Sequence, residues 1–102
     1  PRNNHIYFRF VGGAASINSR SLRIKMMAKI LNSSGFIIKT KGDLLVARIS
    51  NISSEDIERI LDQIGRLVAF TRQLDSLLNS DAAADSFADR FLAGNYSVSQ
   101  DS

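Results

Sequence analysis

The chain has no cysteine and a single histidine. The missing thiols exclude disulfides, thiol catalysis and thiolate metal sites. His5 has no second histidine with which to form a metal pair, and no nucleophile signature such as a serine elbow accompanies it. We therefore expect no metal and no other cofactor, and we predict that the chain by itself is not an enzyme.

Long apolar runs are missing as well. No stretch approaches the roughly 20 apolar residues that cross a bilayer, and the first residues lack the charged and then apolar pattern of a signal peptide. We expect a cytoplasmic protein with no membrane contact. The chain begins at Pro1 instead of methionine, which favours a domain of a longer protein over simple removal of the initiator.

The first half of the chain is poor in acids. Residues 1–50 carry nine lysine or arginine side chains and one acid, Asp43, which gives a formal charge of +8. Residues 51–102 carry four such cations and nine acids, which gives −5. The formal net charge of +3 therefore conceals a bipolar molecule. A small domain of this kind offers its basic side to an anion or to an acidic protein surface.

The apolar content is sufficient for one core. Of the 102 residues, 44% are hydrophobic and 23% are charged, which is typical of a globular protein. A chain of this length forms one domain. We place the domain at residues 1–94 and expect the polar residues 95–102 to form a frayed tail.

Alternating apolar residues predict three strands. Residues 5–11 have the period-2 pattern of a half-buried strand. Residues 36–39 and 44–49 flank a Lys41-Gly42-Asp43 turn, which predicts a hairpin. The two faces of the resulting sheet would differ, with one packed against helices and the other mixed in character. The mixed face would carry Tyr7, Arg9, Ile37, Lys39, Leu44, Val46 and Arg48.

Apolar residues at helical spacing predict three helices. Asn18 or Ser19 is the expected N-cap of the first, whose second face is basic. Ser53 is the expected N-cap of the second, which continues for about 25 residues. Asp81 is the expected cap of a short third helix. The order β-α-β-β-α, followed by a short C-terminal helix, predicts an α+β two-layer sandwich in which helices cover one face of a three-stranded sheet.

The long second helix has three unusual positions. A glycine within a helix costs about 1 kcal/mol relative to alanine, so we attribute Gly65 to close packing against the sheet. Phe70 and Leu77 fall off the apolar stripe and are candidates for contact with a partner. The same helix could pair two copies of the chain.

Part of the chain resembles a known family. The run from His5 to Ala15, the arginines Arg20 and Arg23, the Gly35-Phe36 pair and the Lys41–Leu45 segment are similar to a C-terminal accessory domain of proteins related to phosphoenolpyruvate synthase and pyruvate phosphate dikinase. The resemblance covers about residues 5–49. It implies a non-catalytic module attached to an ATP-dependent phosphotransferase or a relative of one, with the other domains of that parent as partners. No phosphohistidine segment or ATP-binding half is present, so no catalytic residue is carried over.

Two candidate binding sites follow from the residues. Gly12 and Gly13 lie between a strand and a helix, where amide groups bind phosphate, and Arg20 and Arg23 could assist. The spacing lacks the G-x-G-x-x-G pattern, and a tight turn alone would also explain both glycines. The second site is the basic sheet face, which comprises Tyr7, Arg9, Lys39 and Arg48.

The functional prediction is a binding module. A basic face centred on Arg9, Arg20, Arg23, Lys39 and Arg48 would receive an acidic neighbouring domain or a small phosphorylated ligand. One alternative is binding of RNA or another single-stranded nucleic acid, in which Tyr7 alone would serve as the stacking platform. Another alternative is a dimerisation module that forms a homodimer.

Overall fold

The sheet is built around its last strand in sequence. The computed structural model describes residues 4–12 and 17–97. In this structure β3 lies in the middle of the sheet and pairs antiparallel with β1 and with β2, in the order β1-β3-β2. The elements are β1 (Asn4–Val11), α1 (Ile17–Ser33), β2 (Ile37–Lys41), β3 (Leu44–Ile52), α2 (Ser54–Arg72), the 3₁₀ turn η1 (Asp75–Leu77) and α3 (Asp81–Leu92).

The predicted hairpin is confirmed. Lys41 pairs with Leu44 across a two-residue loop, and Gly42 has a φ of +61° whereas Asp43 has no positive φ. Glycine is the residue that adopts this angle at the first position of a type II′ turn. β3 runs three residues further than predicted, to Ile52, because β1 pairs with it as far as that residue.

The end of β3 contains an irregularity that alternation could not predict. The register shifts between Asn4, which pairs with Ile52, and His5, which pairs with Ser50. Asn51 is the extra residue and has a φ of +60°. Asparagine tolerates this left-handed conformation better than most residues, so a bulge forms here and bends the strand toward α2.

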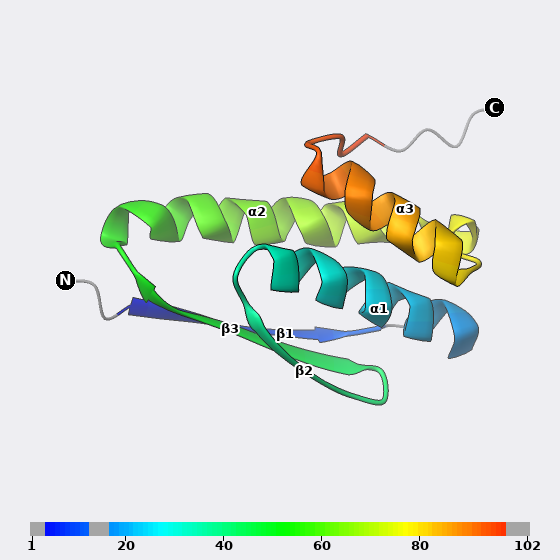
Figure 1. Ribbon diagram of the computed structural model, residues 1–102, viewed down its shortest axis with the longest axis horizontal. Coiled ribbons are helices and arrows are strands. Elements are labelled where there is room, and N and C mark those ends of the chain that lie inside the picture. The colour runs from blue at the N-terminus through cyan, green and yellow to red at the C-terminus, as the bar shows by residue number, and fades with distance from the viewer. Residues whose placement is uncertain (1–3, 13–16, 98–102) are drawn as a thin grey trace.

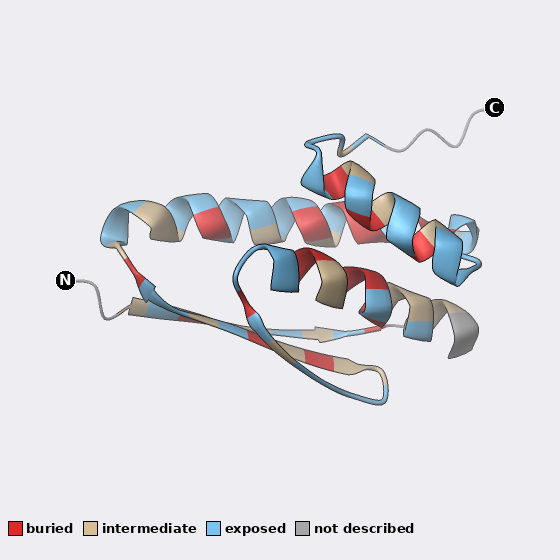
Figure 2. Cartoon of the chain, viewed as in Figure 1, coloured by how far each residue is buried: buried red, intermediate tan, exposed pale blue. Residues whose placement is uncertain are grey.

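All three helices lie on one side of the sheet (Figure 1). The α+β architecture predicted from the sequence is therefore confirmed. Inward positions of the strands are covered, and both Leu45 and Ala47 of β3 are fully buried. Outward positions such as Tyr7 and Ile37 are exposed, so burial alternates along the strands (Figure 2). This alternation divides the sheet into a covered face and an open face.

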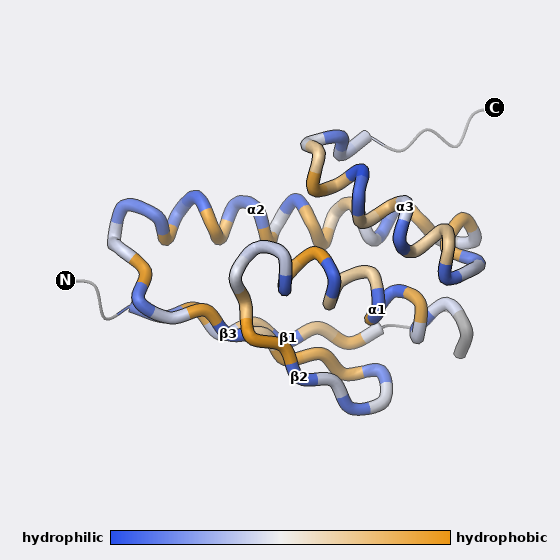
Figure 3. The backbone as a smooth tube through the Cα atoms, in the orientation of Figure 1, coloured by the Kyte–Doolittle hydropathy of each residue, from blue (hydrophilic) through white to orange (hydrophobic). Residues whose placement is uncertain are grey.

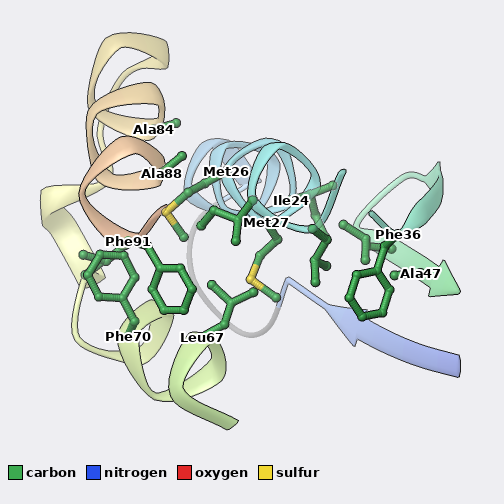
Figure 4. Close-up of a cluster of buried hydrophobic side chains, with 14 of the residues drawn as sticks. Ile24, Met26, Met27, Phe36, Ala47, Leu67, Phe70, Ala84, Ala88 and Phe91 are labelled. Carbon is green, nitrogen blue, oxygen red and sulfur yellow. The ribbon is translucent and has the colours of Figure 1, made fainter. Parts of the chain in front are cut away.

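α1 is buried on two sides. Figure 4 shows Met26 turned toward Ala84 and Ala88 of α3, whereas Ile24 lies on the side of Phe36 and the sheet. Ala84 and Ala88 are fully buried, and their small side chains let the two helices approach closely. α1 therefore links the sheet layer to α3. The helix begins at Ile17, so Asn18 and Ser19 lie in its first turn and the predicted cap position is corrected.

α2 carries its apolar residues toward the interior (Figure 3). Its 19 residues are fewer than the 25 predicted, because the chain leaves the helix after Arg72 and turns through η1. Leu74 and Leu78 are nevertheless fully buried. The apolar pattern continued past Arg72 because the turn buries residues at similar spacing, and periodicity alone does not separate a helix from such a turn.

The expectation that Phe70 is free for a partner is wrong. Phe70 is 1% exposed, and its ring lies 5.3 Å from that of Phe91 and 6.2 Å from that of Phe87. α3 supplies both of these rings, so Phe70 belongs to a second buried side of α2 that faces the third helix. Leu77 is 37% exposed and lies in η1.

Serine is the N-cap residue of both α2 and α3. Ser53 is the N-cap of α2 as predicted, but its hydroxyl donates to Oδ2 of Asp56 at 3.0 Å and accepts no backbone amide. α3 is capped by Ser80, whose Oγ accepts from the amide of Ala83 at 3.0 Å. Asp81 is therefore the first helical residue and not the cap, although its charge still favours the positive end of the helix dipole.

Packing continues past residue 94, where we placed the end of the domain. Tyr96 lies 4.6 Å from Phe91 between ring centroids, and the guanidinium of Arg66 lies 5.7 Å from the Tyr96 ring. Arg90 also donates to the backbone carbonyl of Ser97 at 2.7 Å. These contacts hold residues 95–97 against α2 and α3.

Gly65 gives the first testable prediction. It is exposed, and a Cβ added there would meet nothing within 4 Å, which corrects the explanation by close packing. We expect Gly65→Ala to raise the free energy of unfolding by about 0.5–1 kcal/mol, because alanine loses less backbone entropy in a helix. Urea denaturation measures the change. Gly35→Ala, at a φ of +96°, is the control and should lose stability. A loss of stability in Gly65→Ala would contradict the prediction.

Candidate functional site

The candidate site is the open face of the sheet, which we call the outer sheet face. Its side chains alternate with those of the core along each strand, and no described helix covers it (Figure 1). The face includes every residue that we predicted for it and adds two others. It comprises Tyr7, Arg9, Val11, Ile37, Lys39, Lys41, Leu44, Val46 and Arg48.

Strand register arranges these residues in cross-strand rows. The central member of each row comes from β3, with β1 on one side and β2 on the other. In the first two rows apolar and cationic side chains alternate in both directions, as on a chequerboard. The rows are Tyr7–Arg48–Ile37, Arg9–Val46–Lys39 and Val11–Leu44–Lys41.

Three of the five apolar members are exposed, whereas Leu44 and Val46 are half-buried. Tyr7, Val11 and Ile37 are 60%, 56% and 61% exposed, and they are three of the six large hydrophobic residues exposed in the described part of the chain. Apolar residues that gather on one face mark a contact surface more often than residues scattered singly. A shallow hollow of about 220 Å³ lies beside Tyr7 and Ile37. Its lining is Tyr7, Ile37, Lys39, Val46 and Arg48.

The cationic members have no acidic partner. None of Arg9, Lys39, Lys41 and Arg48 forms an ion pair with any residue that the structure describes, and no acid belongs to the face. Arg9 and Lys39 are separated by one strand, or roughly 10 Å, which is about the screening length at 0.1 M salt. Their mutual repulsion is therefore only partly screened, and an anionic partner would relieve it.

Of the four other basic residues described in the first half, Arg20, Lys25 and Lys29 pair with acids and Arg23 does not. Lys25 pairs with Asp81 at 3.1 Å, and Lys29 pairs with Asp85 and Asp89 at 3.7 and 3.2 Å. These pairs join α1 to α3. Part of the opposite charge of the two halves is therefore used in ion pairs between α1 and α3, and four described cations without an acidic partner lie together on the outer sheet face.

The predicted anion site is occupied by contacts of the fold itself. The amide of Gly12 donates to the carbonyl of Asp43 at 2.9 Å, and Arg20 pairs with the Asp43 carboxylate at 3.5 Å. Nη1 of Arg23 donates to the Gly12 carbonyl at 3.4 Å, whereas its Nε is buried without a hydrogen-bond partner. Gly13 lies outside the described residues. The Gly12 amide is therefore not free for a phosphate.

The two predicted sites are on different sides of the sheet. Arg20 and Arg23 belong to α1, which packs on the covered face, whereas Arg9 and Lys39 project from the open face. Charge alone groups all four residues in one basic half, whereas strand alternation already placed Arg9 and Lys39 on the sheet face opposite the helices. The basic face that we predicted as one surface is thus two separate groups.

Two members of the outer sheet face were missed from the sequence. Val11 continues the alternation of Tyr7 and Arg9 and could have been included on that ground. Lys41 was assigned to the turn, although it ends β2 and pairs with Leu44. The pairing of α1 with α3 also had a signal. Lys25 and Lys29, like Asp81, Asp85 and Asp89, recur at four-residue spacing.

The described residues contain no cluster of three or more metal-ligating side chains. Within the same part of the chain, no helix has the length and apolarity needed to cross a membrane. In comparisons with known proteins, no family model, no curated protein and no solved structure matches this chain. The fold and the site together define an α+β domain with one open sheet face that is both basic and apolar.

The ion pairs of Lys29 give a pH prediction. Its hydrogen bond to Asp89 is the main cause that raises its pKa above the ordinary 10.5, and the charge of Asp85 adds to this. Because the folded state holds the proton more tightly, the stabilisation is complete below pH 10.5 and is lost as the pH rises through the folded-state pKa. We therefore expect Lys29→Met to be less stable than the wild type at pH 9 and to approach it in stability above pH 11.

Urea denaturation between pH 8 and 11.5 measures this difference. Lys39→Met is the control for removal of a lysine that has no acidic partner in the described structure. A stability difference between the wild type and Lys29→Met that stays constant over the whole pH range would contradict the assignment.

Proposed function

We propose that the chain is a non-catalytic docking module that binds an acidic protein surface through the outer sheet face. The observation that supports this is the composition of the face. Four cations without an acidic partner surround exposed apolar side chains, and the face has no cover in the described structure. Binding would bury the apolar side chains and pair the cations in one step.

The chemistry of the face favours a protein as the partner. Tyrosine and arginine are the residue types that dominate binding energy at protein interfaces, and Tyr7 and Arg48 lie side by side in one row. Burial of apolar area contributes about 25 cal/mol per Å², so Tyr7 and Ile37 would provide most of the non-electrostatic attraction. The complementary surface is an apolar centre with carboxylates around it.

RNA binding has less support from the geometry. Sheets that bind RNA stack two or three bases on exposed aromatic rings. Tyr7 is the single aromatic residue of the outer sheet face, because Phe8 and Phe10 project toward the core. The cations could hold a phosphate backbone, but the face offers one stacking platform only. We therefore keep RNA as the second candidate and as an arm of the test.

The resemblance of residues 5–49 supplies a context for the proposal. In a cytoplasmic parent protein similar to phosphoenolpyruvate synthase, the acidic surface would belong to a neighbouring domain of the same chain. A small phosphorylated ligand would instead be expected near Arg20 and Arg23, where the Gly12 amide and the Asp43 carboxylate are already engaged in the fold. The docking proposal requires neither Arg20 nor Arg23.

Titration of the isotope-labelled chain tests the proposal. The probes are a synthetic helical peptide with leucines flanked by glutamates, inorganic phosphate, and a single-stranded oligouridine. We expect the acidic peptide to give saturable amide shifts at Tyr7, Ile37 and Val46. The double variant Lys39→Glu/Arg48→Glu should bind it at least about tenfold more weakly, because both cations become repulsive. Arg72→Glu, an exposed cation of α2, is the control and should bind like the wild type.

Three results would overturn the proposal. The first is the absence of shifts with the acidic peptide at millimolar concentration. The second is tighter binding of oligouridine with a steep salt dependence, which would favour nucleic acid. The third is phosphate shifts confined to Gly12, Arg20 and Arg23, which would favour the small anionic ligand. Equal weakening in Arg72→Glu would show that net charge, and not the outer sheet face, determines binding.

A further inference from the structure

β1 has an open edge whose free backbone groups can be identified. β1 pairs with β3 alone, and the amide of Gly12 points to β3 because it donates to Asp43. Backbone groups of successive residues in an antiparallel strand point to opposite sides. The amides and carbonyls of Phe10, Phe8 and Ile6 therefore point to β3. Those of His5, Tyr7, Arg9 and Val11 point away from it, toward the open edge.

The other edge of the sheet is different. β2 has five residues and carries Lys39 and Lys41, and short edge strands with lysines resist pairing with another chain. β1 has eight residues and contains neither lysine nor proline. Its inward residues Phe8 and Phe10 are only half-buried, in contrast to the fully buried Leu45 and Ala47 of the central strand. The edge of β1 is thus longer than that of β2, carries one cation, Arg9, instead of two lysines, and is flanked by apolar surface.

We propose that β1 is a homodimerisation edge, on which a second copy of the chain pairs antiparallel through its own β1. The register places Phe8 opposite the partner's Phe8 across a two-fold axis. Tyr7 then faces the partner's Arg9, and His5 faces the partner's Val11. Each residue whose backbone groups point outward then lies opposite a residue of the partner whose groups also point outward. Every free amide and carbonyl of the strand therefore forms a hydrogen bond.

Neighbouring registers are less favourable. A shift of two residues in one direction places Arg9 opposite the partner's Arg9 and leaves His5 unpaired. A shift in the other direction places Tyr7 opposite the partner's Tyr7 and leaves Val11 unpaired. The central register instead places the guanidinium of Arg9 beside the ring of Tyr7 twice, which is a favourable cation–π contact. Charge and hydrogen bonding therefore select the same register.

The inward side chains support the same arrangement. In the central register Phe8 faces its own copy, and Ile6 faces the partner's Phe10, so both half-buried aromatic rings of β1 gain apolar neighbours. The two sheets would join into one sheet, and the two outer sheet faces would become one continuous surface. The inference does not depend on the docking proposal, because it rests on the free backbone groups at the edge of β1, although both proposals involve Tyr7 and Arg9.

Proline substitution tests the edge without disturbing the fold. The Tyr7 amide points away from β3, so Tyr7→Pro removes no hydrogen bond within the chain but blocks pairing at the edge. Thr40 is the matched position on β2. Because Lys41 and Leu44 close the two-residue turn, the amide of Thr40 points away from β3. Thr40→Pro therefore makes the same chemical change at the other edge.

Sedimentation equilibrium over a range of concentrations measures the result. We expect the wild type and Thr40→Pro to dimerise, and Tyr7→Pro to dimerise at least about tenfold more weakly. Circular dichroism checks that each variant is folded. A wild type that is monomeric up to millimolar concentration would overturn the proposal, as would equal dimerisation of Tyr7→Pro.

Amide hydrogen exchange on the wild type provides a second test that needs no variant. We expect the amides of Tyr7 and Arg9 to exchange rapidly in dilute protein and to become protected as the concentration rises. The amides of Phe8 and Phe10 should be protected at both concentrations, because they bond to β3. A dimer in which the Tyr7 and Arg9 amides still exchange rapidly would place the interface elsewhere and would contradict the proposal.

Discussion

The structure depends on one constraint, which is that α1 must be buried on two sides. One side packs on the sheet, and the other presents Met26 to the small side chains of Ala84 and Ala88 (Figure 4). α3 consequently packs on a helix and not on the sheet. The contact also brings Lys29 to Asp85 and Asp89. All three helices therefore lie on the same side of the sheet as α1, and no described segment covers the other face.

Charge and topology together determine where the molecule can bind. The sequence is bipolar, but α1 and α3 neutralise each other across their contact, and Arg20 is paired with Asp43. On the open face, four cations without an acidic partner in the described structure alternate with exposed apolar side chains. β1 belongs both to this face and to an open edge. One strand therefore presents side chains for docking and backbone groups for pairing.

Local patterns were sufficient to predict the strands, the turn at Gly42 and seven of the nine residues of the open face, because strand alternation and turn chemistry involve near neighbours in sequence. Contacts between distant elements were not predictable in this way. Phe70 is buried only because α3 returns to it, and α2 ends at Arg72 because the chain must reverse there. Arg20 and Arg9 were grouped for the same reason, since charge in a sequence carries no information on the side of a sheet.

The most direct test of the account is the accessibility of the two sheet faces in solution. A soluble gadolinium chelate broadens the nuclear magnetic resonance signals of exposed side chains in the labelled protein. The account predicts strong broadening of the Ile37 and Val46 methyl signals and none for Leu45 and Ala47, which alternate with Val46 on β3. Protection of Ile37 and Val46 equal to that of Leu45 would show that the outer sheet face is covered within the chain and would contradict the account.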